Sequence, residues 1–271
     1  MSTCAAPASV RHRSCSFWRR SFVAQGVWRD AVLIEVTDPA DPRLVRLAAL
    51  LNATFPDPNT VLGLDRIQEF LQANWADGPR HFCVLVAEQK GSLVGGTIFS
   101  YVVKSNCGFS EYIVVDLACR GLGLGRELFN ARKATLDAHA VRHRHDQCHG
   151  LFIEVDNPER TPRDFAETER ERALDAYQRL RMFDHFGFRR VDVPYVQPPL
   201  ALGKQAVDYL DLLFAPWAFD RQRIPSEWIF DTVEAIWSAW TPETFASHLA
   251  KLRSAVRGPE VALLDPLAAT G

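Results

Sequence analysis

A glycine-rich stretch between an apolar run and a helical pattern has the residue types best suited to chemistry. It reads RGLGLGR from Arg120 to Arg126. The first amides of a helix have no partner inside the helix, and with the helix dipole they attract anions. Because glycine lacks a Cβ atom, a phosphate can approach these amides, and both arginines can add charge-assisted hydrogen bonds. The stretch predicts a phosphate or pyrophosphate site; a strand-to-helix turn that binds nothing is the alternative.

Two common nucleotide-binding motifs are excluded by the spacing. The pattern G-x-G-x-G lacks one residue of the G-x-G-x-x-G dinucleotide fingerprint. Val141 and Arg142 stand where that fingerprint has an acidic residue. No Gly-Lys pair is followed by Ser or Thr, so the P-loop is excluded as well. A phosphate bound at this stretch would therefore belong to another kind of ligand.

The overall composition is typical of a globular protein, and its small net charge does not favour binding to nucleic acid. The chain has 271 residues, 47% of them hydrophobic, and a net charge of -2, so we expect no nucleic acid partner. No apolar run reaches the roughly 18 residues of a membrane-spanning helix, so we expect no membrane partner either. The six cysteines form no C-x-x-C pair and no standard zinc spacing occurs, which favours reduced thiols, a cytoplasmic location and no bound metal.

Apolar runs and helical periodicity predict a mixed α/β sheet in one domain. The expected strands cover residues 31–36, 81–88, 93–103, 110–117, 151–155, 188–193 and 206–214. The expected helices cover residues 39–54, 64–75, 126–140 and 167–186.

The two ends of the chain differ from this central part, residues 31–216. Residues 1–30 are rich in Arg and Ser, with no acid before Asp30; we expect a disordered tail, and a transit peptide is the alternative. Residues 217–271 predict a helical hairpin that holds four of the tryptophans. We expect these tryptophans to pack the hairpin onto the core; a contact in a homodimer is the alternative.

The run from Val115 to Gly125 resembles a family signature. Val115-Asp116 followed by Arg120-Gly121-Leu122-Gly123-Leu124-Gly125 is similar to the V-x-x-x-x-R-G-x-G-x-G pattern of the GNAT superfamily of N-acetyltransferases, which lies between the fourth strand and the next helix. The element order is similar as well, over about residues 31–214. The resemblance implies a mostly antiparallel GNAT-type sheet flanked by helices, with acetyl-CoA as co-substrate.

The resemblance also implies where acetyl-CoA binds. The amides from Gly121 to Arg126 would hold the pyrophosphate, and the backbone near Val115 would pair with the pantetheine arm. The strands that carry Val115 and Ile153 would splay apart to admit it. Asn157 is a candidate for an Asn that many members offer to CoA, although it directly follows the fifth strand. The implied cofactor-binding residues are Ile113, Val114, Val115, Arg120, Gly121, Leu122, Gly123, Leu124, Gly125, Arg126 and Asn157.

Acetyl transfer to an amine needs a base for the amine and an acid for the thiolate. Glu111 is the candidate base; its even offset from Val115 predicts that both lie on one face of the sheet. The family often places a Tyr acid where this chain has Phe183. Tyr177 and Tyr195 are the candidate acids, and water is the alternative.

The sequence thus predicts an acetyl-CoA-dependent N-acetyltransferase that acts on a small-molecule or peptide amine by direct attack. Two alternatives stay open. The chain could bind CoA without catalysis, as a sensor or scaffold, which the phenylalanine at position 183 favours. It could also be an acyltransferase for longer acyl chains.

Overall fold

The computed structural model describes residues 31–73, 78–171, 176–218 and 222–268. The expected tail, residues 1–30, lies outside them. The strands are β1 (Ala31–Glu35), β2 (Arg80–Gln89), β3 (Ser92–Val102), β4 (Cys107–Val115), β5 (Gly150–Asp156), β6 (Arg189–Val191), β7 (Leu210–Pro216), β8 (Arg223–Pro225) and β9 (Glu260–Leu264). The α-helices are α1 (Pro42–Thr54), α2 (Leu64–Gln72), α3 (Leu124–Arg142), α4 (Arg163–Glu171), α5 (Ala176–His185), α6 (Ser226–Trp240) and α7 (Phe245–Ala255).

In the described part of the chain, nine strands form one sheet in the order β1-β2-β3-β4-β5-β7-β6-β9-β8. Neighbouring strands are antiparallel except β4 and β5, which run parallel. A parallel pair needs a crossover connection, and α3 supplies it. The expected fold class, a mixed and mostly antiparallel sheet flanked by helices, is confirmed.

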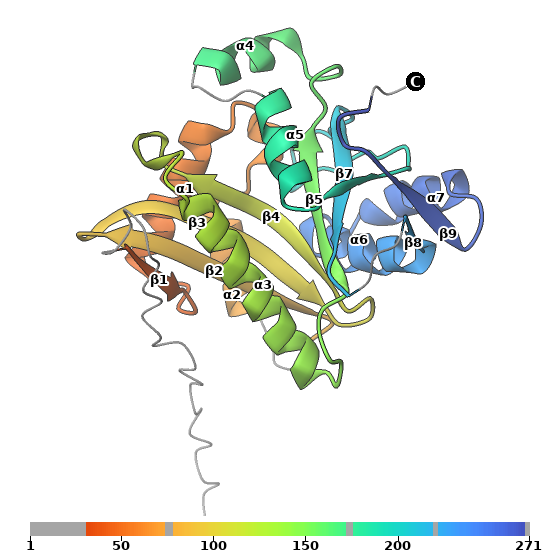
Figure 1. The fold of residues 1–271 in the computed structure, drawn as a ribbon, viewed down its shortest axis with the longest axis horizontal. Helices are drawn as coiled ribbons and strands as arrows, with labels where there is room; N and C mark the ends of the chain where they lie inside the picture. Colours follow the sequence, from red (N-terminus) through yellow and green to blue (C-terminus); the bar gives the residue numbers. More distant parts are fainter. Residues whose placement is uncertain (1–30, 74–77, 172–175, 219–221, 269–271) are drawn as a thin grey trace, which may run out of the picture.

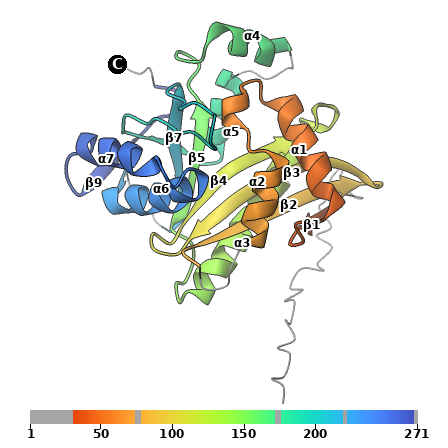
Figure 2. The same cartoon turned by 180° about the vertical axis from the view of Figure 1, so that it is seen from behind.

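Helices cover both faces of the sheet. α3 and α5 lie on the face turned to the viewer in Figure 1, and α1, α2 and α6 lie on the opposite face, seen in Figure 2. Buried side chains form one cluster with α1, α2 and α6 and another with α3 and α5. Within the described residues no helix is long and apolar enough to cross a membrane.

The sheet opens between β4 and β5. The two strands are paired only from Gly108 with Leu151 to Ser110 with Ile153. β4 continues to Val115 beside β3, and β5 continues beside β7. We call this unpaired stretch beyond Ser110 the β4–β5 fork; it is the separation of strands that the resemblance implies.

A β-bulge in β4 corrects one expectation about the site. The pairing of β3 with β4 shifts between Ile98 and Phe99, so Glu111 is the extra residue of the bulge. Its carboxylate meets Ser100 on the α1, α2 and α6 face, whereas Val115 packs against α3. The prediction that Glu111 and Val115 share a face was wrong, because the extra residue breaks the alternation of side chains.

The C-terminal hairpin packs on the core as expected. Trp237 and Trp240 of α6 are buried, and the Trp240 ring meets Phe109 edge-on at 5.9 Å between centroids. Two strands were not expected from the sequence: β8, which comes before α6, and β9, which follows α7. β9 pairs with β6 on one side and with β8 on the other. Among the described residues, the C-terminal segment therefore adds two strands, β8 and β9, to the sheet as well as two helices.

Candidate active site

The glycine stretch forms an open loop at the start of α3, at the wide end of the β4–β5 fork. Gly121 has φ = 75° and Gly123 has φ = 96°, values that favour glycine strongly over other residues. Gly123 is the N-cap of α3 and offers no side chain to the first amides of the helix. A Cβ atom at either position would meet nothing within 4 Å, so the space in front of these amides is open. This is the geometry expected of an anion site.

The flanking arginines are held by neighbouring elements. Arg120 Nε donates to the carbonyl oxygen of Val115 at 3.1 Å, across the end of β4. Arg126 Nη2 donates to His185 Nε2 on α5 at 2.7 Å. Burial lowers the pKa of Arg120, and the nearby charge of Arg179 lowers it further. Arginines of the loop itself (Arg120), of α3 (Arg126) and of α5 (Arg179) thus lie near one another at this end of the fork.

Among the strands that the structure describes, none pairs with one backbone edge of β4 in the fork. Residues Ile113, Val114 and Val115 pair on their other side with Thr97, Gly96 and Gly95 of β3. Beyond Ser110 no described strand pairs with β4 on the β5 side. An extended ligand could therefore use this edge as an added strand would.

Glu111 lies where the fork closes. Its side chain is buried, Oε1 accepts from Ser100 Oγ at 2.7 Å, and Arg80 Nη1 lies 3.9 Å from the same oxygen. Oε2 has no hydrogen-bond partner among the described residues. Burial raises the pKa of Glu111 to about 7, and the Arg80 charge opposes this rise. A carboxyl with this pKa can accept a proton at neutral pH.

A second carboxyl, Glu154, was missed by the sequence analysis. It lies on β5, one residue beyond the last pair of the fork, and the Tyr195 hydroxyl donates to its Oε1 at 2.5 Å. Burial raises the pKa of Glu154 to about 8; the bond from Tyr195 lowers it and the charge of Glu111 raises it. The available signal was an acid inside the apolar run LFIEV.

The two candidate tyrosines occupy different environments. Tyr195 is 2% exposed and packs beside Trp237, with 5.8 Å between ring centroids. Tyr177 on α5 is 48% exposed, so it does not belong to the buried carboxyl pair. Phe183 is buried against Phe188, so an apolar ring fills the position at which the family often has its acid.

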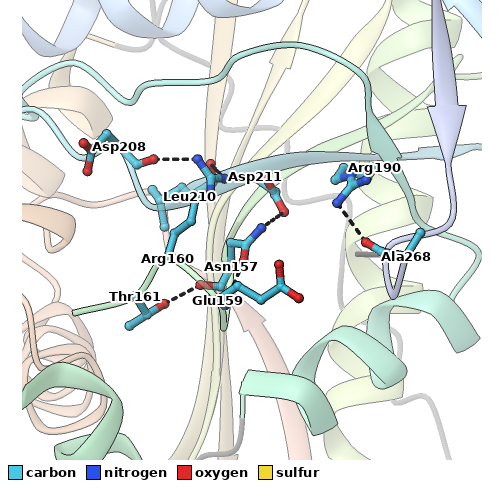
Figure 3. Close-up of polar contacts among 9 residues, drawn as sticks. All are labelled: Asn157, Glu159, Arg160, Thr161, Arg190, Asp208, Leu210, Asp211 and Ala268. Carbon is cyan, nitrogen blue, oxygen red and sulfur yellow. Dashed lines mark hydrogen bonds and ion pairs between the residues drawn. The ribbon is translucent and has the colours of Figure 1, made fainter. Parts of the chain in front are cut away.

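Asn157 holds the turn after β5 (Figure 3). Its Nδ2 donates to Asp211 Oδ2 at 2.9 Å, and its Oδ1 accepts from the amide of Glu159 at 2.9 Å. Arg160 also binds Asp211, which fixes the turn to β7. Both ends of the Asn157 side chain are thus used within the protein, and a role toward CoA stays a prediction.

Comparison with known proteins agrees with this geometry. Residues 44–168 match the family described as "Acetyltransferase (GNAT) family", and this segment includes the glycine loop and both glutamates of the fork. The chain carries a domain of the GNAT acetyltransferase family, whose members use acyl-CoA. No curated protein sequence matches the chain.

Solved structures of the same family are distantly similar. A GNAT-family protein from Bacteroides thetaiotaomicron has 14% identity and a TM-score of 0.49, over 82% of this chain and 96% of that one. A GNAT family acetyltransferase from Elizabethkingia anophelis with acetyl-CoA bound has 13% identity and a TM-score of 0.42, over 69% and 99%. The ribosomal-protein-S18-alanine N-acetyltransferase from Escherichia coli has 11% identity and a TM-score of 0.44, over 71% and 97%.

Proposed function

We propose that this protein transfers an acetyl group from acetyl-CoA to a primary amine. One observation carries the proposal: the open glycine loop lies at the wide end of the β4–β5 fork, and two carboxyls, the buried Glu111 and the partly buried Glu154, lie at its closed end. A phosphate-bearing donor anchored at the loop would extend along β4 and bring its acyl end to Glu111 and Glu154. No nucleophile of the protein is needed for direct attack by an amine.

Glu111 and Glu154 provide the base. The nitrogen of the neutral amine attacks the thioester carbonyl carbon, and its proton passes to the carboxyl pair. The C–S bond then breaks and its electron pair goes to sulfur. Since the two carboxyls influence each other, they titrate as a pair. Burial raises both pKa values, to about 7 and about 8, so the pair can take up a proton near neutral pH.

The amine approaches from the face of the sheet covered by α1, α2 and α6, because Glu111 lies on that face. Tyr112 fixes the connection between α1 and α2 there: its hydroxyl donates to the carbonyl of Thr60 and accepts from the amide of Leu62, both at 2.8 Å. The connection thus covers the acceptor side of the fork. We propose a small-molecule or peptide amine as acceptor.

Calorimetric titration with acetyl-CoA tests the first half of the proposal, with NAD and ATP as controls. We expect saturable binding of acetyl-CoA only. A screen of amines for release of CoA thiol tests the second half. Absence of acetyl-CoA binding would remove the support for an acetyltransferase and leave the glycines as a structural turn.

A second candidate function is CoA binding without catalysis, in a sensor or scaffold. The buried Phe183 favours it, since a phenyl ring cannot donate a proton to the leaving thiolate. The amine screen separates the two functions: binding of acetyl-CoA with no CoA release from any amine supports the sensor, whereas release above the rate of hydrolysis supports the transferase.

A further inference from the structure

Arg132 of α3 is a fully buried cation with an incomplete set of partners. Its side chain is 0% exposed, Nη1 donates to Ser110 Oγ at 2.5 Å, and the guanidinium lies 5.3 Å from the centre of the Phe129 ring. Nε and Nη2 are buried too, and neither has a hydrogen-bond partner among the described residues. These nitrogens share one edge of the guanidinium, the edge that binds oxyanions in a bidentate manner.

Such an arrangement is costly for the folded protein. An unpaired charge in the interior loses hydration without compensation, and buried polar groups are almost always hydrogen-bonded. Burial lowers the pKa of Arg132 to about 9, while the charge of Glu111 opposes this shift. Arg132 is therefore cationic near neutral pH. A cost of this kind is tolerated where the unpaired group has a function.

The position of Arg132 indicates that function. Its partner Ser110 belongs to the last pair that joins β4 to β5, so the guanidinium lies at the closed end of the fork. From Ser110 to Val115 the fork extends over roughly 17 Å of strand. A ligand that enters along β4 from the glycine loop can go no further than this pair, so its reactive end comes close to Arg132.

We propose that the Nε–Nη2 edge of Arg132 stabilises the sulfur of CoA as a thiolate when the C–S bond breaks. This inference rests on the proposed function and deepens it. The electron pair of the broken bond stays on sulfur, the amine proton stays on the carboxyl pair, and Arg132 keeps its own protons throughout. An electrostatic partner of this kind removes the need for a proton donor at the position of Phe183.

The proposal predicts a measurable property of bound CoA that needs no amine. The ultraviolet absorbance of the thiolate is followed against pH in the complex with CoA, and the complex with desulfo-CoA provides the reference that subtracts the cysteines of the protein. We expect the thiol of bound CoA to have a pKa about one unit or more below that of free CoA. A pKa equal to or above that of free CoA would overturn the proposal, without any variant.

Variants assign the effect to Arg132. Arg132→Met should raise the pKa of the bound thiol by about one unit or more and leave the affinity for desulfo-CoA unchanged. Lys133→Met, which removes a neighbouring cation paired with Asp137, should leave the thiol pKa unchanged. An equal thiol pKa in wild type and Arg132→Met would also overturn the proposal. If neither CoA nor desulfo-CoA binds the wild type, the proposed function itself has failed, which is a separate result.

Discussion

Glu111 directly follows Ser110 and Glu154 directly follows Ile153, and Ser110 and Ile153 form the last pair that joins β4 to β5. The side chain of Glu111 is buried and Glu154 is partly buried at the point where the sheet opens. Different features of the two strands position the two acids: Glu111 is the extra residue of a bulge in β4, whereas Glu154 follows the regular alternation of side chains along β5. Both positions can be tested by changes that remove a charge and keep the shape of the side chain.

Glu111→Gln and Glu154→Gln test the carboxyl pair. Either change should lower kcat by about 10²- to 10⁴-fold, the usual contribution of a general base, and leave the affinity for acetyl-CoA unchanged. Steady-state kinetics and calorimetry measure the two quantities. Glu88→Gln, a change at an acid of β2 that pairs with Arg43 and Arg46, is the control. Unchanged kcat in Glu111→Gln would reject Glu111 as the base.

Arg80→Met tests the pKa of the base. The charge of Arg80 lowers the pKa of Glu111, so its removal raises that pKa. A base acts when it is deprotonated, and the rising limb of kcat/KM against pH should therefore move from near pH 7 upward by about one unit. Arg66→Met is the matched control, because Arg66 lies over the same Phe70 ring, at 4.7 Å against 4.6 Å for Arg80. A shift toward lower pH in Arg80→Met would contradict the assignment.

Gly123→Val tests the anion loop. A β-branched residue is strained at φ = 96°, and its side chain would enter the open space before the first amides of α3. We expect acetyl-CoA affinity to fall at least about 100-fold, which corresponds to roughly 2.7 kcal/mol. Gly91→Val controls for strain, because Gly91 has φ = 80° in the turn between β2 and β3, and a Cβ atom added there would also meet nothing within 4 Å. Equal affinities of both variants would place the phosphate site elsewhere.

Tyr195→Phe and Tyr177→Phe separate the two tyrosines. The bond from Tyr195 lowers the pKa of Glu154, so its loss should raise that pKa and reduce kcat roughly tenfold, as expected for a hydrogen bond to a charged group. Tyr177→Phe should leave kcat unchanged, since Tyr177 lies at the surface. The opposite result would identify the exposed tyrosine as the acid.

Arg132→Met should also change stability. The substitution removes a buried charge whose Nε and Nη2 have no hydrogen-bond partner among the described residues and fills its place with an apolar side chain. The free energy of unfolding should therefore rise by about 1 kcal/mol or more. Lys133→Met should lower it by roughly 0.3–0.5 kcal/mol, because the pair with Asp137 is lost. Denaturant unfolding measures both. A clear loss of stability in Arg132→Met would show that the arginine stabilises the fold.

Much of the fold could be predicted because apolar runs and turns mark the strands directly. The β2–β3 hairpin and the glycine loop are examples, since each depends on residues next to one another in sequence. The bulge at Glu111 could not be predicted, because an extra residue within a strand leaves no periodic signal. Strand β9 was missed because its partner, β6, lies about 70 residues earlier.

The candidate site was predictable only in part for the same reason. The glycine loop is local, and its amides and arginines follow from the order of residues. Glu154 and Arg132 become notable through burial and through neighbours that come from other elements. An acidic residue or an arginine among residues of mixed polarity gives no sign, in the sequence alone, that folding will bury it where two strands separate.

The position of α6 has a consequence for the biosynthesis of the protein. Trp237 lies beside Tyr195, which holds Glu154, and Trp240 lies against Phe109 of β4. A ribosome makes β4, β5 and the glycine loop long before residue 240, so a nascent chain has its donor loop and both glutamates before the tryptophans of α6 that pack beside them. On the proposed mechanism, binding of the donor can therefore precede activity during synthesis, because the carboxyl pair gains its neighbours in α6 only later.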